Sequence, residues 1–201
     1  MKKIPKQSTK KFLENAIASK SENRDVLKLI YKDNDYAVST NGFLLHLTTE
    51  ENSYSLGLNK TKNNGVLEGK YPNYKGIMQS LDQNSLQLYI NPTELVHALK
   101  KALVFSDSLV RVTVEVFGES YFLNVKGSSA KRGESSTLVE FDLWKVFGNI
   151  EEFELQVDGR ALARSILGLC GNESIFCSLS PVNPNLFEGK NRKVVIMPMS
   201  S

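Results

Sequence analysis

The residue types that most often carry out enzymatic chemistry are sparse in this sequence. Its two cysteines, Cys170 and Cys177, have six residues between them and no histidine nearby, which is neither a disulfide framework nor the ligand spacing of a zinc site. The only histidines are His46 and His97, and no recognisable nucleophile motif accompanies either one. We therefore predict that the chain is not an enzyme, and we expect no catalytic residue, no metal ligand and no cofactor.

Basic side chains recur at helical spacing in two later segments. His97, Lys100 and Lys101 follow an i, i+3, i+4 pattern, and Arg160 and Arg164 are four residues apart. Such spacing places cations on one stripe of a helix, away from its apolar face. Two interpretations stay open at this point: the stripes gather on one charged surface, or each side chain simply faces solvent.

The apolar end of the chain, residues 193–199, is a second candidate site. Residues 194–196 are β-branched and suit a strand packed on both faces, whereas Pro198 cannot continue a central ladder. Met197 and Met199 therefore flank the end of the strand. Methionine is flexible and polarisable, so this pair either adapts to several partners or fills a gap in the core.

Three short amphipathic helices are expected to position these groups. Thr9 is predicted to cap the first helix. Asn91, followed by a proline, has the form of a helix start, and this second helix should run to about Phe105. Asp158 is predicted to cap a third helix over residues 159–169.

Strands are predicted between these helices. The dipeptide Asn41-Gly42 lies between two apolar runs, residues 36–39 and 43–47, and is a strong hairpin signal. Further strands are expected at residues 26–31, 86–90, 110–117, 120–125, 136–141, 153–157, 175–179 and in the segment 193–199. Each predicted helix is followed by several strands, and this threefold recurrence indicates an α+β class with helices laid along one side of antiparallel sheets.

Two segments are expected to connect these elements. Residues 48–64 are rich in Ser, Asn and Lys and are interpreted as an exposed connection with one strand near residues 54–58. Residues 69–77 contain Pro72 and Gly76 together with two tyrosines, and we expect a packed loop there. A second structural unit is predicted to begin near Leu86.

Length and composition are those of an ordinary globular protein. The 201 residues suffice for one large or two small domains, and 41% of them are hydrophobic and 23% charged. The net charge of +3 permits contact with a polyanion but does not by itself indicate one. The sequence contains no signal segment and no run of about 18 apolar residues, so we expect a cytoplasmic protein without membrane contact.

Five stretches, in order along the chain, resemble the bacterial DNA polymerase III beta subunit, the sliding clamp. Residues 38–45 (V-S-T-N-G-F-L-L) look like that family's A-T-D-G-H-R-L turn, and residues 66–74 (V-L-E-G-K-Y-P-N-Y) are similar to its I-E-G-K-F-P-D-Y. Residues 92–102 resemble the first helix of its third domain, and residues 153–167 resemble that domain's F-N-x-x-Y-L-L-D-x-L stretch. Residues 194–199 (V-V-I-M-P-M) resemble its terminal V-V-M-P-M.

The resemblance implies a DNA-clamp fold in which helices form the inner wall of a ring and sheets the outer wall. Such a ring encircles duplex DNA without reading its sequence, which requires diffuse attraction to phosphates and no contacts to base edges. The residues that the resemblance places at the DNA are Lys11, Arg24, His97, Lys100, Lys101, Arg160 and Arg164.

The resemblance also implies a groove that binds short, partly aromatic and aliphatic peptides of polymerases and repair proteins. Three separated segments would converge there, and methionines suit a pocket that accepts many ligands. The matching positions are Thr40, Gly42, Phe43, Leu44, Pro72, Gly76, Ile77, Val195, Met197, Pro198 and Met199.

The chain departs from the family by lacking one whole domain. Residues 1–88 resemble a truncated second clamp domain, and residues 89–201 resemble a complete third domain. Two units per chain would form the family's ring of six as a trimer, acting as a processivity factor for polymerase or repair proteins. The alternative is a clamp-derived regulator that binds peptides of replication proteins without encircling DNA.

Overall fold

The computed structural model describes residues 7–50, 54–59, 66–67, 70–79, 81 and 86–199. The helices in this part of the chain are α1 (Thr9–Glu14), α2 (Tyr74–Gln79), α3 (Pro92–Phe105) and α4 (Gly159–Ile166), with 3-10 turns η1 (Asp25–Lys28) and η3 (Ile150–Glu152). The strands are β1 (Ile30–Lys32), β2 (Ala37–Thr40), β3 (Leu44–Thr48), β4 (Gly57–Asn59), β5 (Val66–Leu67), β6 (Leu86–Ile90), β7 (Leu109–Phe117), β8 (Ser120–Ser129), β9 (Gly133–Val146), β10 (Glu154–Asp158), β11 (Ile175–Leu179), β12 (Asn185–Glu188) and β13 (Arg192–Ile196).

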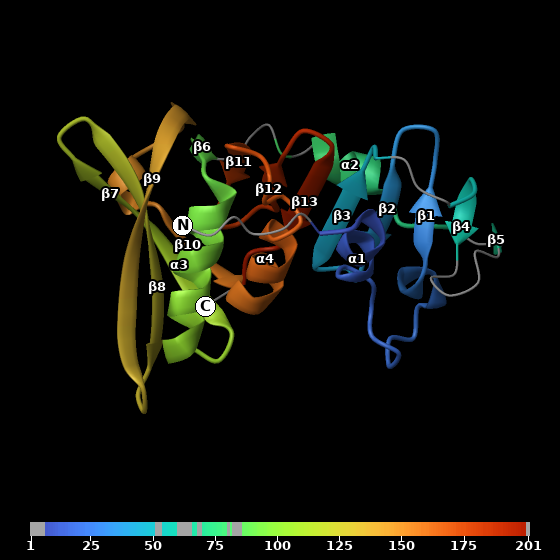
Figure 1. Cartoon of the computed structure of the whole chain (residues 1–201), viewed down its shortest axis with the longest axis horizontal. Coiled ribbons are helices and arrows are strands. Elements are labelled where there is room, and N and C mark those ends of the chain that lie inside the picture. The colour runs from blue at the N-terminus through green and yellow to red at the C-terminus, as the bar shows by residue number, and fades with distance from the viewer. Residues whose placement is uncertain are drawn as a thin grey trace.

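The 13 strands of the described residues form one sheet along the length of the molecule (Figure 1). Their order is β10-β7-β8-β9-β6-β11-β12-β13-β3-β2-β1-β4-β5, and neighbouring strands are antiparallel. The last strand, β13, pairs with β3 and so joins the two ends of the chain into one sheet. Within the described residues, no helix has the length and apolar character needed to cross a membrane.

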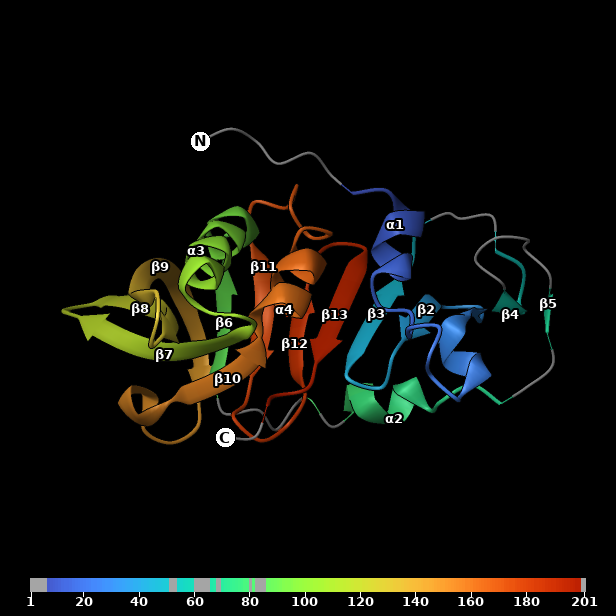
Figure 2. The ribbon, with the colours of Figure 1, turned by 90° about the horizontal axis from the view of Figure 1, so that it is seen from below.

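The threefold recurrence of a helix followed by strands is present in the structure. Helix α1 precedes β1 to β3, α3 precedes β7 to β9, and α4 precedes β11 to β13. These three helices lie along one side of the strands, while α2 lies apart from them near the start of β3 (Figure 2). The predicted α+β class is therefore confirmed.

Local capping signals located two of these helices correctly. Asn91 Oδ1 accepts hydrogen bonds from the backbone N–H groups of Thr93 at 2.9 Å and Glu94 at 3.2 Å, as expected for a helix start. Asp158 caps α4 in the same way, with two bonds of 2.9 Å. The prediction for α1 is wrong by one residue, because Ser8 is its N-cap and the Thr9 hydroxyl instead donates to Glu50.

Several predicted boundaries differ from the structure; the third helix, for example, ends at Ile166 and not at residue 169. The strand expected at residues 26–31 begins only at Ile30, because the preceding residues form the turn η1 that buries Leu27. The loop expected at residues 69–77 contains helix α2, since Pro72 precedes the helix instead of interrupting it. Strand β12 begins directly after Pro184, in a segment for which no strand was predicted.

Strands β8 and β9 are longer than predicted because of Gly127. A Cβ atom at this position would lie 2.1 Å from the Ala102 carbonyl oxygen of α3. Glycine thus lets the strand pass directly against the helix backbone and continue to Ser129.

Two hydrophobic clusters occupy the two faces of the sheet. The larger cluster contains the buried residues of α1, α3 and α4 and the strand residues that face them, including Leu44 and Ile196. The smaller cluster contains Leu45, Tyr74 of α2 and Val195. Side chains alternate along a strand, so Val195 and Ile196 lie on opposite faces.

A buried ion pair fixes the N-terminal elements to the C-terminal ones. The Arg192 side chain is 4% exposed and donates to Glu50 Oε2 at 2.6 and 3.0 Å and to the Gly168 carbonyl at 2.9 Å. The Thr9 hydroxyl donates to the same Glu50 oxygen at 2.7 Å. Helix α1, strand β13 and the end of α4 are therefore held by one polar network.

Candidate functional site

The segment after β13 is tied to both halves of the chain. The Met197 N–H donates to the Phe43 carbonyl at 2.9 Å, which prolongs the β3–β13 pairing, and the Met199 N–H donates to the Gln156 carbonyl of β10 at 2.8 Å. The backbone is fixed in this way while the two methionine side chains stay 39% and 43% exposed. The methionines of residues 197–199 thus form an apolar surface and do not fill a gap in the core.

Two adjacent hollows flank this segment. One has a volume of about 410 Å³ and is lined by Phe43, Leu44, Ile196 and residues 197–199, together with Asn41, Asp158 and Ala161. The other has a volume of about 550 Å³ and is lined by the same three terminal residues together with Glu154, Gln156, Pro181 and Val182. The Met-Pro-Met segment is therefore the wall that both hollows share.

The β2–β3 turn places Phe43 in solvent beside this wall. Asn41 Oδ1 accepts from the N–H groups of Phe43 at 3.0 Å and Leu44 at 2.8 Å, and the Thr40 hydroxyl donates to the Leu44 carbonyl at 2.8 Å. Gly42 has a φ of 94°, which favours glycine. The Phe43 side chain is 75% exposed as a result.

The structure does not bring all the predicted groove residues to these hollows. Val195 belongs to the smaller cluster on the other face, and Ile196 lines the hollow in its place. Pro72, Gly76 and Ile77 lie in or next to α2 and line neither hollow. Thr40 and Gly42 shape the β2–β3 turn but line neither hollow. Of the predicted set, only Phe43, Leu44 and residues 197–199 therefore line the two hollows.

Helix α2 is anchored to the β1–β2 turn by charged groups. The Tyr74 hydroxyl donates to Asp33 at 2.5 Å, and Lys75 Nζ lies 3.1 Å from Asp33 and 2.9 Å from Asp35. Burial raises the pKa of Asp33, but the hydrogen bonds from Tyr74 and from two backbone N–H groups outweigh it and lower that pKa to about 2. Asp33 is therefore an ionised anchor that fixes the position of Ile77.

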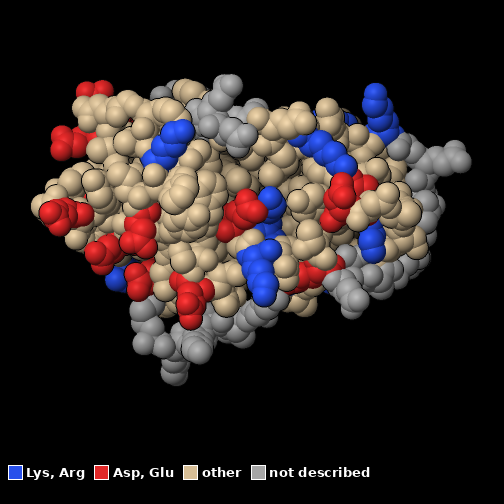
Figure 3. Space-filling view, turned by 90° about the horizontal axis from the view of Figure 1, so that it is seen from above, with Lys and Arg blue, Asp and Glu red and all other residues tan. Residues whose placement is uncertain are grey.

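Most of the predicted cations lie on the helix side of the molecule. Lys11 of α1, Lys100 and Lys101 of α3, and Arg160 and Arg164 of α4 are all exposed, and none forms an ion pair with another described residue. These five residues are called the helix cations below. The charges are arranged differently on the face seen from above in Figure 3, where acidic side chains gather over β7 to β9.

Two other predicted cations have a different environment. Arg24 pairs with Glu22 at 3.0 Å, and the hydrogen bonds from Arg24 lower the pKa of Glu22 to about 2. His97 is half-buried on α3, and its Nε2 is buried without a hydrogen-bond partner among the described residues. Neither side chain is as free for a ligand as the helix cations are.

A serine–histidine pair is present but sealed inside the protein. His46 Nε2 lies 2.8 Å from Ser165 Oγ, and Nδ1 lies 2.6 Å from the Phe12 carbonyl oxygen. Both side chains are fully buried. Burial is the main cause that lowers the pKa of His46 to about 4, and the charge of Arg192 adds to it against the effect of the Phe12 carbonyl. A substrate cannot reach this pair, which instead connects β3 to α4.

Burial also raises the pKa of both cysteine thiols, so neither Cys170 nor Cys177 is an activated nucleophile. Among the described residues, no group of three or more His, Cys, Asp or Glu side chains could hold a metal ion. Within the described residues, these thiols and carboxylates therefore form neither an activated nucleophile nor a metal site.

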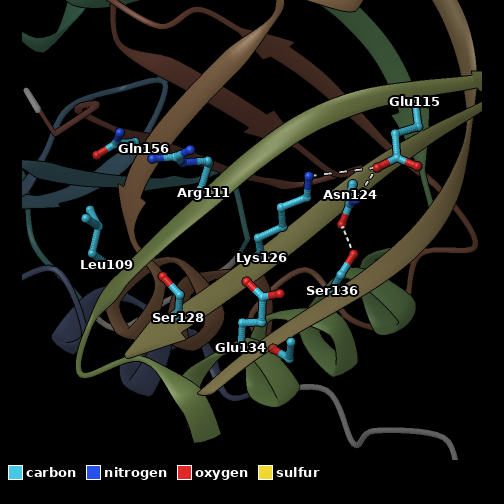
Figure 4. A pocket seen from close by; sticks show the side chains of 10 residues that line it. Leu109, Arg111, Glu115, Asn124, Lys126, Ser128, Glu134, Ser136 and Gln156 are labelled. Atoms are coloured by element: carbon cyan, nitrogen blue, oxygen red, sulfur yellow. Dashed lines mark hydrogen bonds and ion pairs between the residues drawn. The ribbon is translucent and has the colours of Figure 1, made fainter. Parts of the chain in front are cut away.

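A further hollow, of about 660 Å³, lies on the face of β7, β8 and β9 and was not among the predicted sites (Figure 4). Several of its polar groups pair with one another: Asn124 donates to Glu115 and accepts from Ser136 at 2.6 Å, and Lys126 lies 3.9 Å from Glu115. Arg111, at its edge, pairs with Glu154 at 3.2 Å. Ser135 also lines the hollow, and its buried Oγ has no hydrogen-bond partner among the described residues.

The fold is that of the bacterial sliding clamps. The chain matches the DNA polymerase sliding clamps of Pseudomonas aeruginosa (TM-score 0.73, 14% identity) and Bacillus subtilis (0.74, 14%) and the DNA polymerase III beta subunit of Thermotoga maritima (0.74, 15%). Each match covers 96% of this chain but only 64%, 62% and 63% of the respective clamp chain. No protein-family model and no curated protein matches the sequence. The clamp fold predicted from five short motifs is thus confirmed, and the chain spans less than two thirds of these clamps.

Proposed function

We propose that this protein is a sliding-clamp-like tether that holds DNA on its helix side and recruits polymerase or repair proteins at the Met-Pro-Met segment. The observation that carries the proposal is the construction of this segment. Its backbone is bound to Phe43 on one side and Gln156 on the other, whereas its methionine side chains are left in solvent between two hollows. A rigid backbone with adaptable apolar side chains is suited to binding varied peptides.

The ligand of the two hollows would be a short peptide with aliphatic and aromatic side chains. The hollow beside Phe43 is bounded mainly by apolar groups, and an apolar side chain buried there would contribute about 1.5–3 kcal/mol if fully removed from water. The second hollow includes Glu154 and Gln156 at its rim, which offer hydrogen-bond partners to a peptide backbone. One extended segment would cross the shared methionine wall and occupy both.

The helix cations would hold duplex DNA without reading its sequence. Their charges are exposed on three different helices and unpaired among the described residues, which suits diffuse contact with phosphates. If all five contact phosphates, the logarithm of the association constant should fall with log salt concentration at a slope of about −4.5 per chain. His97 and Arg24 would contribute less, because one is half-buried and the other is paired.

Two modes of action follow from the short length of the chain. If residues 1–88 and 89–201 each act as one clamp unit, three copies would supply the six units of a ring. The chain covers only 62–64% of the clamp chains that it matches. This short length favours the second candidate, a peptide-binding regulator that does not encircle DNA.

Light scattering across a range of protein concentrations separates the two modes. A trimer would support the ring, and retention on circular but not linear DNA would then show encirclement. A monomer at every concentration would exclude the self-sufficient ring and leave the non-encircling regulator.

Peptide binding tests the tether in either mode. The probe is a fluorescently labelled hexapeptide that carries adjacent leucine and phenylalanine. We expect Phe43→Ala combined with Met199→Ala to lower the affinity for this peptide by at least tenfold, as measured by anisotropy. Leu56→Ala is the matched control, because Leu56 is an exposed apolar residue that lines neither hollow. Equal affinities of the double variant and the control would remove the peptide site from the Met-Pro-Met segment.

A further inference from the structure

A row of aromatic side chains crosses β9, β6 and β11 on the face of the sheet opposite α3. Trp144 and Tyr89 meet edge to face with ring centroids 6.1 Å apart, and Tyr89 and Phe176 lie 5.4 Å apart. Their neighbours Leu88 and Cys177 point to the other face and belong to the core. This aromatic row is separate from the hollows at residues 197–199.

The most exposed member of the row is aimed outward by a β-bulge. Leu143 pairs with Leu88 and Lys145 pairs with Gln87, so Trp144 between them has no partner on β6. A bulge of this kind redirects a side chain and is often found at functional positions. Trp144 is 66% exposed and Tyr89 is 39% exposed, which is unusual for the largest side chains of a sheet.

The charges around Trp144 identify the ligand. Asp142 pairs with Tyr89 across the strands, and Glu140 lies two residues before Asp142 on β9. Both are exposed without an ion pair to any described residue. Free carboxylates repel the phosphates of a nucleic acid and attract a cation. The neighbouring cation, Lys145, contacts a ring of its own, because its Nζ lies 4.3 Å from the centre of the Phe147 ring just beyond β9. A ligand cation would make the same kind of contact with Trp144.

We propose that Trp144, Tyr89 and Asp142 form a docking site for an arginine-bearing segment of a protein partner. The guanidinium group would stack on the open face of Trp144, which is the aromatic side chain that binds cations best. Asp142 would accept its hydrogen bonds, and Glu140 would attract a second cation of the same segment. The site would bind a second partner on the face of the sheet opposite α3 while a peptide occupies the hollows at residues 197–199.

Trp144 reports directly on this site, because it is the only tryptophan in the sequence. The probe is a blocked peptide of alternating glycine and arginine, titrated into the full chain while the tryptophan fluorescence is followed. We expect saturable quenching that weakens as the salt concentration rises. A glutamate peptide of equal length and an oligothymidine strand should each bind at least tenfold more weakly.

The variant Asp142→Asn keeps the size of the side chain and removes its charge. We expect it to lower the affinity for the arginine peptide about two- to fivefold, which is the range that an exposed ion pair contributes. Asp25→Asn removes the same charge from η1 in the N-terminal half and should leave the affinity unchanged. Equal affinities of the two variants would overturn the assignment. Tighter binding of oligothymidine would show a nucleic-acid surface instead, and fluorescence that changes with protein concentration alone would show self-association. Either result would refute the proposal.

Discussion

Acidification should loosen the junction between the two halves of the chain through His46. Its ring lies in the core, stacked on Phe12 with ring centroids 4.3 Å apart, and its nitrogens contact the Phe12 carbonyl and Ser165. The neutral ring donates from Nδ1, because the carbonyl oxygen can only accept. Protonation adds a charge in a fully buried position near the cation of Arg192.

The size of the effect follows from the pKa of His46, which burial lowers from 6.5 to about 4. The native state therefore binds fewer protons than the unfolded state between these pH values, so the free energy of unfolding rises with pH in this window. The contribution of neutral His46 to the free energy of unfolding is complete above pH 6.5 and is lost as the pH falls toward 4. At about 1.4 kcal/mol per pH unit, the whole window is worth about 3 kcal/mol, of which about 2 kcal/mol lies between pH 7 and 5.

Urea denaturation at pH 7 and pH 5 measures this difference. We expect the wild type to lose about 2 kcal/mol more on this pH change than His46→Gln loses. Should His46→Gln fail to fold, the imidazole proton resonances of the wild type give the same answer, because His46 should begin to titrate only near pH 4. A resonance of His46 that titrates near 6.5 would refute the reasoning.

Three further predictions test other parts of the structure. Gly168→Ala would place a Cβ atom 2.3 Å from Phe12 and should lower the free energy of unfolding by about 1–3 kcal/mol in urea denaturation. Asn91→Ala should cost about 1 kcal/mol by the same assay, because it removes the cap of α3, and Asn91→Asp should restore it. Reversing four of the helix cations should reduce DNA binding in a filter or anisotropy assay and leave peptide affinity unchanged; equal loss of both would show that the sites are not separate. The four positions are Lys100, Lys101, Arg160 and Arg164.

Short-range signals in the sequence were sufficient for much of the fold. Asn91, Asp158 and the Asn41-Gly42 turn each determine the backbone through bonds to residues two to four positions away, so they can be recognised without knowing the rest of the structure. The length of β8 could not be predicted, because it depends on Gly127 passing against Ala102 of a distant helix.

The candidate site was predicted only in part for the same reason. Phe43 and the methionines were identified, but the face on which Val195 lies depends on its register with Leu45 of β3. Asp158 and Ala161 also line the hollow but were not predicted to do so. No local signal in the sequence shows that the start of α4 lies next to the end of β13 in space. The His46–Ser165 contact joins residues 119 positions apart, and no spacing rule anticipates such a contact.

The central claim is that one molecule holds DNA and a peptide at the same time on separate surfaces. The most direct test is to sediment duplex DNA with the protein and the labelled hexapeptide at low salt and to measure the peptide in the DNA fraction. We expect the peptide to sediment only when the protein is present, and to be lost with Phe43→Ala and Met199→Ala although the protein still sediments. Peptide that releases the protein from DNA, or that stays in the supernatant while the protein sediments, would contradict the account.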